Sequence, residues 1–298
     1  MAQSLLAGGT AGIVSRSCVA PIERVKILLQ VQSLSAQGQT PRYSGIASSL
    51  HSIFKNEGVA GLWKGNGANC VRVFPSSALQ FYCYPMWKTT LFGEREDLHP
   101  TERLCAGALA GAVAQTATYP LDFIRARIQV DMRARYSGGV WSAIYTVVTN
   151  EGPLALYRGI VPSLIGIMPY VGIDFAVYDI LRGMLPKRSP GSDEPTVLGK
   201  LAAGGLAGAC AQTVAYPLDT VRRILQVQDT VHVVQQSGEA YTGMIDCLVR
   251  LVRRDGVLTL YSGLGANYLK VVPSVGISFV VYEASKQWLK DTFPPPPT

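Results

Sequence analysis

The sequence YPLDFIRARIQ (residues 119–129) decides the organisation of this chain. It overlaps the end of an uncharged run, LCAGALAGAVAQTATYPL (residues 104–121), which is about long enough to cross a bilayer as a helix. Asp122 and Arg125 follow two and five residues after Pro120. Proline bends a helix, and charges at membrane depth face water or pair with each other. The stretch therefore predicts a membrane helix that bends where ion pairs form.

The same pattern occurs three times in the chain. APIERVKILLQ begins at residue 20, YPLDFIRARIQ at 119 and YPLDTVRRILQ at 216. A fixed internal period is the signature of a repeat architecture. We therefore expect three repeats, with boundaries at residues 1–95, 96–190 and 191–298.

Each repeat also has a second half that recurs. The elements are EGVAGLWKG (57–65), EGPLALYRG (151–159) and DGVLTLYSG (255–263). An apolar run with an internal proline follows each of them. We therefore expect each repeat to hold a spanning helix, a short amphipathic helix and a second spanning helix, which makes six spanning helices in all.

Paired glycines precede each of the three prolines at one register. Spaced as GxxxG, they predict that neighbouring helix backbones approach closely in the membrane. The pairs are Gly8 and Gly12, Gly107 and Gly111, and Gly204 and Gly208.

The composition supports a membrane protein with an anionic partner. Charged residues make up 16% of the chain, against about 25% in a typical soluble domain, and the net charge is +7. Basic residues alone do not distinguish nucleic acid from lipid or metabolite, but the apolar GxxxG runs argue against nucleic-acid binding. The six cysteines form no CxxC pair and the three histidines lie far apart, so we expect no metal site and no cofactor. Hydrolase and nucleotide-hydrolysis signatures are also missing, so we expect no enzyme.

Taken together, the three PxDxxR or PxExxK motifs and their second halves resemble the mitochondrial carrier family over nearly the whole chain. The resemblance implies an all-α membrane protein with six transmembrane helices in three pseudo-threefold repeats and short matrix helices. It implies a multi-pass protein of the mitochondrial inner membrane that acts as a monomer and binds cardiolipin.

The resemblance also implies a gate on the matrix side, where an acid of one repeat pairs with a base of another. Static ion pairs that merely hold the bundle together are the alternative interpretation. The expected pairs are Glu23–Arg125, Asp122–Arg222 and Asp219–Lys26, braced by Gln30, Gln129 and Gln226.

A second gate is implied on the cytoplasmic side by motifs of the form [FY][DE]xx[KR]. Asp179 with Arg182 and Glu283 with Lys286 fit this form. The expected pairs are Asp179–Lys286 and Glu283–Lys88. In the first repeat Pro85 stands where an acid belongs, which leaves Arg182 without a partner and predicts a weaker gate.

A substrate site is implied between the two gates. Twelve residues before the tyrosines of the cytoplasmic gate lie Arg72, Gly166 and Lys270. The Gly166-Ile167 pair resembles nucleotide carriers, where Tyr170 one turn later would complete a slot for a purine. Arg16 aligns with a phosphate-binding lysine of ADP/ATP carriers, and Asp174 resembles ATP-Mg/phosphate carriers. We expect Arg16, Arg72 and Lys270 to hold phosphate groups through charge-assisted hydrogen bonds.

The expected function is exchange of adenine-nucleotide-type anions by alternating access. The candidate substrates are ATP-Mg, ADP or AMP with phosphate, or a coenzyme A-like anion. A carrier of adenosine phosphosulfate or of another small anion remains an alternative. An uncoupling-type proton-leak carrier, which has the same fold, is a further one.

Overall fold

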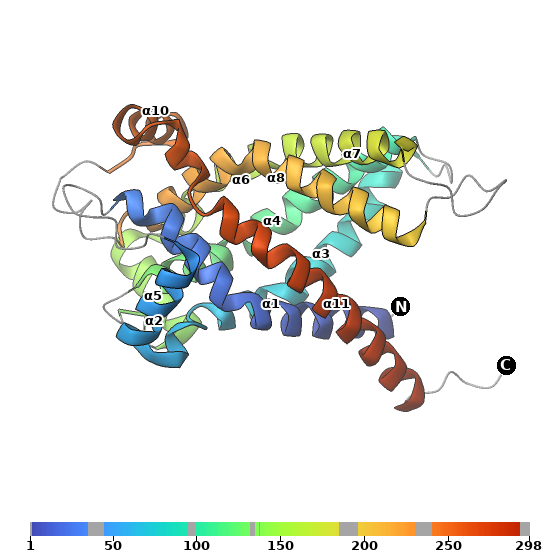
Figure 1. The fold of residues 1–298 in the computed structure, drawn as a ribbon, viewed down its shortest axis with the longest axis horizontal. Coiled ribbons are helices and arrows are strands. Elements are labelled where there is room, and N and C mark those ends of the chain that lie inside the picture. The colour runs from blue at the N-terminus through green and yellow to red at the C-terminus, as the bar shows by residue number, and fades with distance from the viewer. Residues whose placement is uncertain are drawn as a thin grey trace.

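The computed structural model describes residues 2–34, 45–93, 99–131, 135–136, 138–184, 196–230 and 240–292. In these residues all regular structure is helical (Figure 1). The long helices are α1 (Ala2–Val31), α3 (Asn66–Phe92), α4 (Pro100–Val130), the pair α6 (Ile160–Ile165) and α7 (Ile167–Met184), α8 (Val197–Val227) and α11 (Leu264–Thr292). The short elements are η1 (Gln32–Leu34), α2 (Ile46–Gly61), α5 (Gly139–Glu151), η2 (Pro153–Tyr157), α10 (Met244–Asp255) and η3 (Val257–Tyr261).

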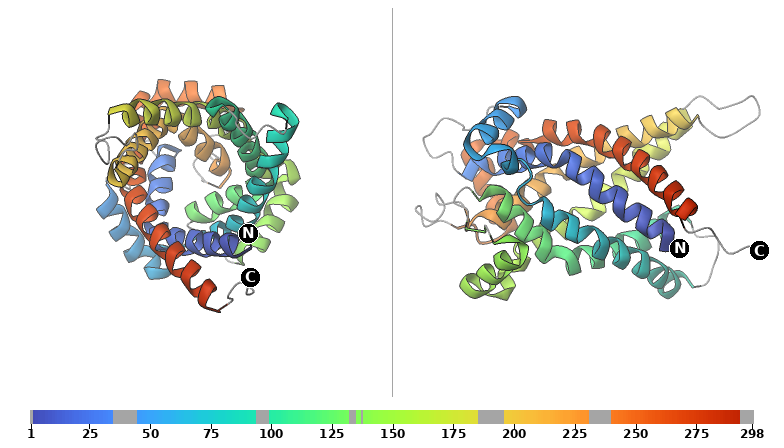
Figure 2. Two further views of the ribbon diagram at one scale, coloured as in Figure 1. Left: turned by 90° about the vertical axis from the view of Figure 1, so that its right-hand side faces the viewer. Right: turned by 90° about the horizontal axis from the view of Figure 1, so that it is seen from below.

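The long helices form a closed ring, as the end-on view of Figure 2 shows. Contacts run in the order α1, α3, α4, α7, α8, α11 and back to α1. Helices α2, α5 and α10 lie together at one end, which we call the short-helix end, while α1 begins and α11 ends at the opposite, termini end (Figures 1 and 2). Each predicted repeat thus supplies one long helix, one short helix and a second long helix.

Hydropathy alone does not identify all of the long helices as membrane spans. Within the described residues, Pro153–Met184 and Val257–Trp288 are the two segments apolar enough for a helix to cross a membrane. Helices α1, α4 and α8 have 30 or 31 residues, enough to cross a hydrocarbon core about 30 Å thick. Their hydropathy is lowered by glycines and by the charged residues after Pro21, Pro120 and Pro217, among which Glu23, Asp122 and Asp219 pair with bases of other repeats.

Alanines, and not most of the predicted GxxxG glycines, form a buried stripe with a spacing of four residues on α1, α4 and α8. A Cβ added to Gly8, Gly107, Gly111 or Gly204 would meet nothing within 4 Å. The residues one position earlier are buried alanines, which share the four-residue spacing of the glycines. They are Ala7 and Ala11, Ala106 and Ala110, and Ala203 and Ala207. The prediction of close approach at these four glycines is therefore wrong for this conformation; Gly12, by contrast, lies against Val73.

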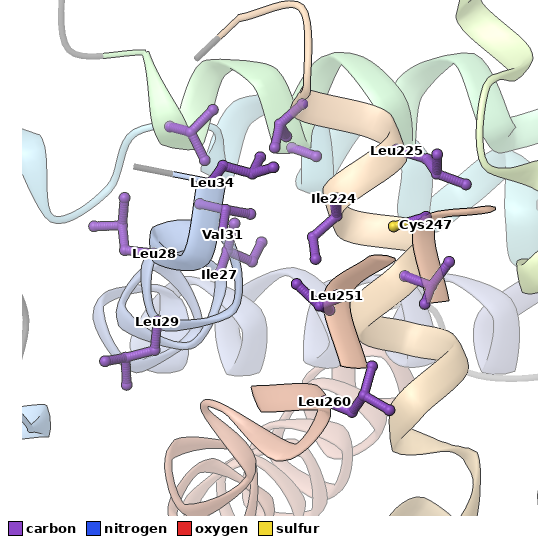
Figure 3. Packing of buried hydrophobic residues seen from close by; sticks show 14 of the residues in the cluster. Ile27, Leu28, Leu29, Val31, Leu34, Ile224, Leu225, Cys247, Leu251 and Leu260 are labelled. Atoms are coloured by element: carbon purple, nitrogen blue, oxygen red, sulfur yellow. The ribbon is translucent and has the colours of Figure 1, made fainter. Parts of the chain in front are cut away.

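The short-helix end contains the main apolar core (Figure 3). Ile27, Leu28 and Val31 of α1 pack against Ile224 of α8 and Leu251 of α10. These side chains come from the first and third repeats, so this core joins the two ends of the chain.

Three glycines fix where the second long helix of each repeat begins. Gly65, Gly159 and Gly263 have φ values of +79°, +80° and +85°, which residues with a Cβ rarely adopt. A Cβ at these positions would also lie 2.9 to 3.0 Å from a backbone carbonyl of another repeat. Those carbonyls belong to Arg125, Arg222 and Lys26, the predicted gate bases. Because each of these glycines packs against a carbonyl of another repeat, they fix the point along the helices where neighbouring repeats contact each other.

Candidate functional site

Helices α1, α4 and α8 contact one another near the short-helix end, and three ion pairs lie there. Each pair joins two repeats, as the resemblance to the carrier family implied. The N–O distances are 2.5 Å for Arg125–Glu23, 2.6 Å for Arg222–Asp122 and 2.7 Å for Lys26–Asp219. Because the prolines place each acid and base on the same turn of three converging helices, the pairs close the ring at this end.

The predicted glutamine braces differ among the three repeats. Gln30 Nε2 donates to Asp219 at 3.3 Å, and Gln226 Nε2 donates to Asp122 at 3.2 Å and to the Tyr119 hydroxyl at 3.0 Å. In the described part of the chain, no hydrogen bond joins the Gln129 side chain to Glu23 or Arg125, and its Oε1 has no partner. Their function as braces of a gate stays a prediction.

Asp122 is the most heavily paired acid of the ring. Besides Arg222 it contacts Arg223 Nη1 at 3.1 Å and Arg72 Nη1 at 3.8 Å. Its side chain is only 1% exposed, against 20% for Asp219. The repeat register did not identify Arg223, because the first and second repeats have Ile27 and Ala126 at this position.

Each predicted substrate cation is held by a specific partner. Arg16 Nη1 donates to Asn69 Oδ1 at 3.2 Å, and Arg72 Nη1 donates to Gln115 Oε1 at 3.5 Å. Lys270 Nζ donates to Glu23 Oε1 at 3.2 Å. Two of the three cations, Arg72 and Lys270, therefore already contact acids of the ion-pair ring.

In the second repeat, the position equivalent to Arg72 and Lys270 is Gly166, which carries no charge and borders a cavity instead. Gly166 lies at the junction of α6 and α7, and the cavity beside it has a volume of about 210 Å³. Ile167 and Tyr170 line it, together with Asp219 and Arg222 of the ion-pair ring. Gly166 thus borders open space next to Asp219, the acid that pairs with Lys26.

Asp174 lies on α7, but it lines neither the cavity beside Gly166 nor the larger cavities that contain Gln115 and Glu283. A Cβ added to Gly208 of α8 would lie 3.7 Å from its Oδ1. Asp174 therefore faces α8, and the structure does not bring it to the predicted slot.

The predicted pairs at the termini end are not formed in this conformation. Among the described residues no ion pair joins Lys88, Asp179, Arg182, Glu283 or Lys286, and Lys286 Nζ lies 5.8 Å from the centre of the Tyr282 ring. Glu283 and Tyr282 line a cavity of about 610 Å³ that reaches Arg16. The ring is therefore closed by ion pairs at the short-helix end, whereas the five residues of the predicted cytoplasmic gate form none among the described residues.

Further charge clusters support the short-helix end. Glu57 accepts hydrogen bonds from Arg24 at 2.7 and 2.9 Å, and Lys64 lies 2.5 Å from it. Burial raises the pKa of the Glu57 carboxyl, but Lys64 and Arg24 outweigh burial, so its pKa lies below the ordinary value. In the second repeat Glu151 pairs with Arg127 in the same way.

Comparisons with known proteins agree with this architecture. A family model described as "Mitochondrial carrier protein" matches residues 1–95, 96–189 and 193–293. The mitochondrial adenine nucleotide transporter ADNT1 of Arabidopsis thaliana is 44% identical, over 96% of this chain and 87% of that protein. The mitochondrial carrier YPR011C of Saccharomyces cerevisiae is 42% identical, over 94% and 90%.

The mitochondrial adenyl nucleotide antiporter SLC25A24 of Mus musculus is 38% identical, over 96% of this chain. The matched region spans 58% of the mouse protein. With three matches to the family model and these relatives, the chain belongs to the mitochondrial carrier family and is a transporter that crosses the mitochondrial inner membrane several times.

Proposed function

We propose that this carrier exchanges adenine-nucleotide-type anions by alternating access. The observation that carries the proposal is the asymmetry of the ring. Two repeats present a cation, Arg72 or Lys270, and the third presents the cavity of Gly166, Ile167 and Tyr170. Phosphates suit the cations and a flat base suits the cavity, so one molecule with both parts fits the arrangement.

The named activities of the relatives support the same substrate class. ADNT1 is an adenine nucleotide transporter and SLC25A24 an adenyl nucleotide antiporter. ATP-Mg, ADP or AMP exchanged with phosphate therefore rank before coenzyme A and adenosine phosphosulfate. A monomeric carrier that needs cardiolipin and has no enzymatic activity is part of the proposal.

The contacts of the cations suggest how binding weakens the matrix gate. Lys270 contacts Glu23 at 3.2 Å, and Arg72 lies 3.8 Å from Asp122. Phosphate oxygens would compete with these two carboxylates for the same donors. The two acids would then lose part of their stabilisation, and the matrix ion pairs would separate more easily. A substrate shifts such an equilibrium only through its different affinity for the two states.

Exchange measured in liposomes tests the proposal. The panel contains ATP-Mg, ADP, AMP, coenzyme A, adenosine phosphosulfate and phosphate, and proton conductance is recorded in parallel. The decisive variant is Gly166→Arg, which would fill the cavity and add a cation. It should abolish nucleotide uptake and keep the thermal stability of the protein. Ile167→Ala and Tyr170→Ala should weaken binding by about 1–3 kcal/mol each, the scale of base stacking on an aromatic ring.

Gly166→Ala is the matched control for this test. Its Cβ would make an ordinary contact of 3.7 Å with Leu218 and a tight one of 3.1 Å with the Pro162 carbonyl. Alanine leaves most of the cavity open, so this variant should keep uptake. If Gly166→Arg transports ATP and coenzyme A as well as the parent does, the cavity is not the nucleotide contact. Proton conductance without nucleotide exchange would favour an uncoupling-type carrier.

A further inference from the structure

Three polar residues share one register, five positions before each proline, but they have different surroundings. They are Arg16, Gln115 and Gln212. Arg16 donates to Asn69, and Gln115 accepts from Arg72, so both belong to the phosphate end of the site. Gln212 makes no hydrogen bond within the described part of the chain, and it lines the cavity beside Gly166.

A second polar side chain in the same cavity also lacks a partner. Ser163 of α6 is 7% exposed, and its hydroxyl has no hydrogen bond among the described residues. A buried polar group without a partner costs free energy, so such groups in native proteins generally have one. Ser163 and Gln212 enter the cavity from different repeats. The buried Ser163 hydroxyl therefore indicates that a ligand supplies its partner, and the partly exposed Gln212 lines the same cavity and can contact that ligand.

The size of the cavity limits which part of a ligand enters it. Its volume of about 210 Å³ lies below the roughly 300–1,000 Å³ of sites that hold a whole drug-sized ligand. It therefore accommodates a ring system and not the full nucleotide. Ile167 and Val171 also line the adjoining cavity, which contains Gln115, the partner of Arg72. A base beside Gln212 and phosphates near Arg72 can thus belong to one molecule.

We propose that Gln212, with Ser163 beside it, binds the amino-bearing edge of the adenine ring and sets the base preference of the carrier. This inference rests on the proposed function. A glutamine amide pairs with adenine through two hydrogen bonds, because its oxygen accepts from the 6-amino group and its nitrogen donates to a ring nitrogen. Ser163 can donate or accept, so it can bind a remaining polar atom of the ring.

The test compares ATP with purine riboside 5′-triphosphate, which lacks any group at C6. This probe is preferred over a 6-oxo purine, because a Gln212 amide rotated by 180° could donate its N–H to the 6-oxo oxygen and still bind the base. Exchange affinities are measured in liposomes for the parent, Gln212→Leu, Gln212→Asn and Ser163→Ala. The parent should prefer ATP by about fivefold to a hundredfold, the scale of one good amide–base pair. Gln212→Leu should largely remove this preference, because ATP loses both amide hydrogen bonds whereas the purine triphosphate loses only the one to its ring nitrogen.

Gln115→Leu is the matched control, since it makes the same change at the equivalent position of another repeat. It disturbs Arg72, so it should weaken both triphosphates by one factor and leave their ratio unchanged. The inference is overturned if the preference for ATP survives in Gln212→Leu, or if the parent shows no preference at all. In both cases ATP exchange by the parent would still support the proposed function. A parent that exchanges neither triphosphate overturns the proposed function as well. Thermal unfolding of each purified variant verifies that it is folded.

Discussion

Neutralising the acids of the matrix ion-pair ring should destabilise the carrier to different degrees. Asp122→Asn removes a carboxylate that contacts Arg222 at 2.6 Å, Arg223 at 3.1 Å and Arg72 at 3.8 Å. Asp219→Asn removes one that has a single ion pair among the described residues, with Lys26 at 2.7 Å. The two substitutions are chemically identical, so their difference reports the surroundings of each acid.

The surroundings predict a larger loss for Asp122→Asn. Breaking a buried ion pair by removing one partner costs roughly 3–5 kcal/mol, because the other charge stays buried. Asp122→Asn leaves Arg222 and Arg223, and arginine stays charged, whereas the Lys26 left by Asp219→Asn can lose its proton. We therefore expect about 5 kcal/mol for Asp122→Asn and about 3 kcal/mol for Asp219→Asn. At roughly 2–4 °C per kcal/mol, Tm falls by about 10–20 °C and 6–12 °C respectively.

Thermal unfolding of the purified carrier in detergent measures both losses, and liposome exchange shows whether transport falls with them. Asp179→Asn is the matched control. Asp179 is exposed and has no ion pair among the described residues, so the Tm of this variant should equal that of the parent. If Asp219→Asn lowers Tm as much as Asp122→Asn or more, the additional arginines do not make Asp122 the centre of the ring.

The same contacts determine which charge reversal can restore transport. Asp122→Arg with Arg222→Asp places a new arginine beside Arg223 and Arg72, so this double variant should recover little. Lys26→Asp with Asp219→Lys reverses a pair without another ion-paired partner and should recover more of the transport lost in the single variants. An equal recovery in both double variants would contradict this reasoning.

Two further substitutions test the predicted gate at the termini end and one of the glycines that precede the second long helix of each repeat. Pro85→Glu supplies the acid that the predicted cytoplasmic gate would need opposite Arg182, and it should shift the resting population towards the matrix-open state by about 0–1 kcal/mol, the value of a partly solvated pair. Labelling of a cavity cysteine from the matrix side measures this shift, and a decrease in labelling would exclude the assigned pairing. Gly263→Ala should lower stability by about 2 kcal/mol or more, because φ is +85° and the new Cβ would lie 2.9 Å from the Lys26 carbonyl. Gly276→Ala, where a Cβ meets nothing within 4 Å, is its control in the same thermal-unfolding assay, and equal losses would refute the argument.

Much of the architecture could be predicted because the repeats are in register. Proline, acid and base recur at the same offsets, and the resemblance to the mitochondrial carrier family implied which acid pairs with which base before any coordinates were known. The choice between GxxxG glycines and the adjacent alanines could not be made in this way. Both sets have a spacing of four residues, and only the rotation of the packed helices decides which set is buried.

In the candidate site, too, some residues could be predicted from the sequence and others could not. The twelve-residue offset from the tyrosines of the cytoplasmic motifs located Arg72, Gly166 and Lys270, because a substrate without threefold symmetry needs repeats that differ. Asp174 was grouped with them from its resemblance to one branch of the family. In the folded chain it faces α8, because its direction depends on how α7 rotates against its neighbour.

By itself, the sequence determined the three repeats, the family and the register of the acids and bases, since these follow from local spacing along one chain. Only the tertiary structure decided that Arg223 and Arg72 share Asp122 with Arg222. It also decided that Gln115 holds Arg72, while Gln212, which has no hydrogen bond among the described residues, lines the Gly166 cavity. These relations join side chains from different repeats, and they depend on helix rotation and side-chain direction, which spacing along the chain does not specify.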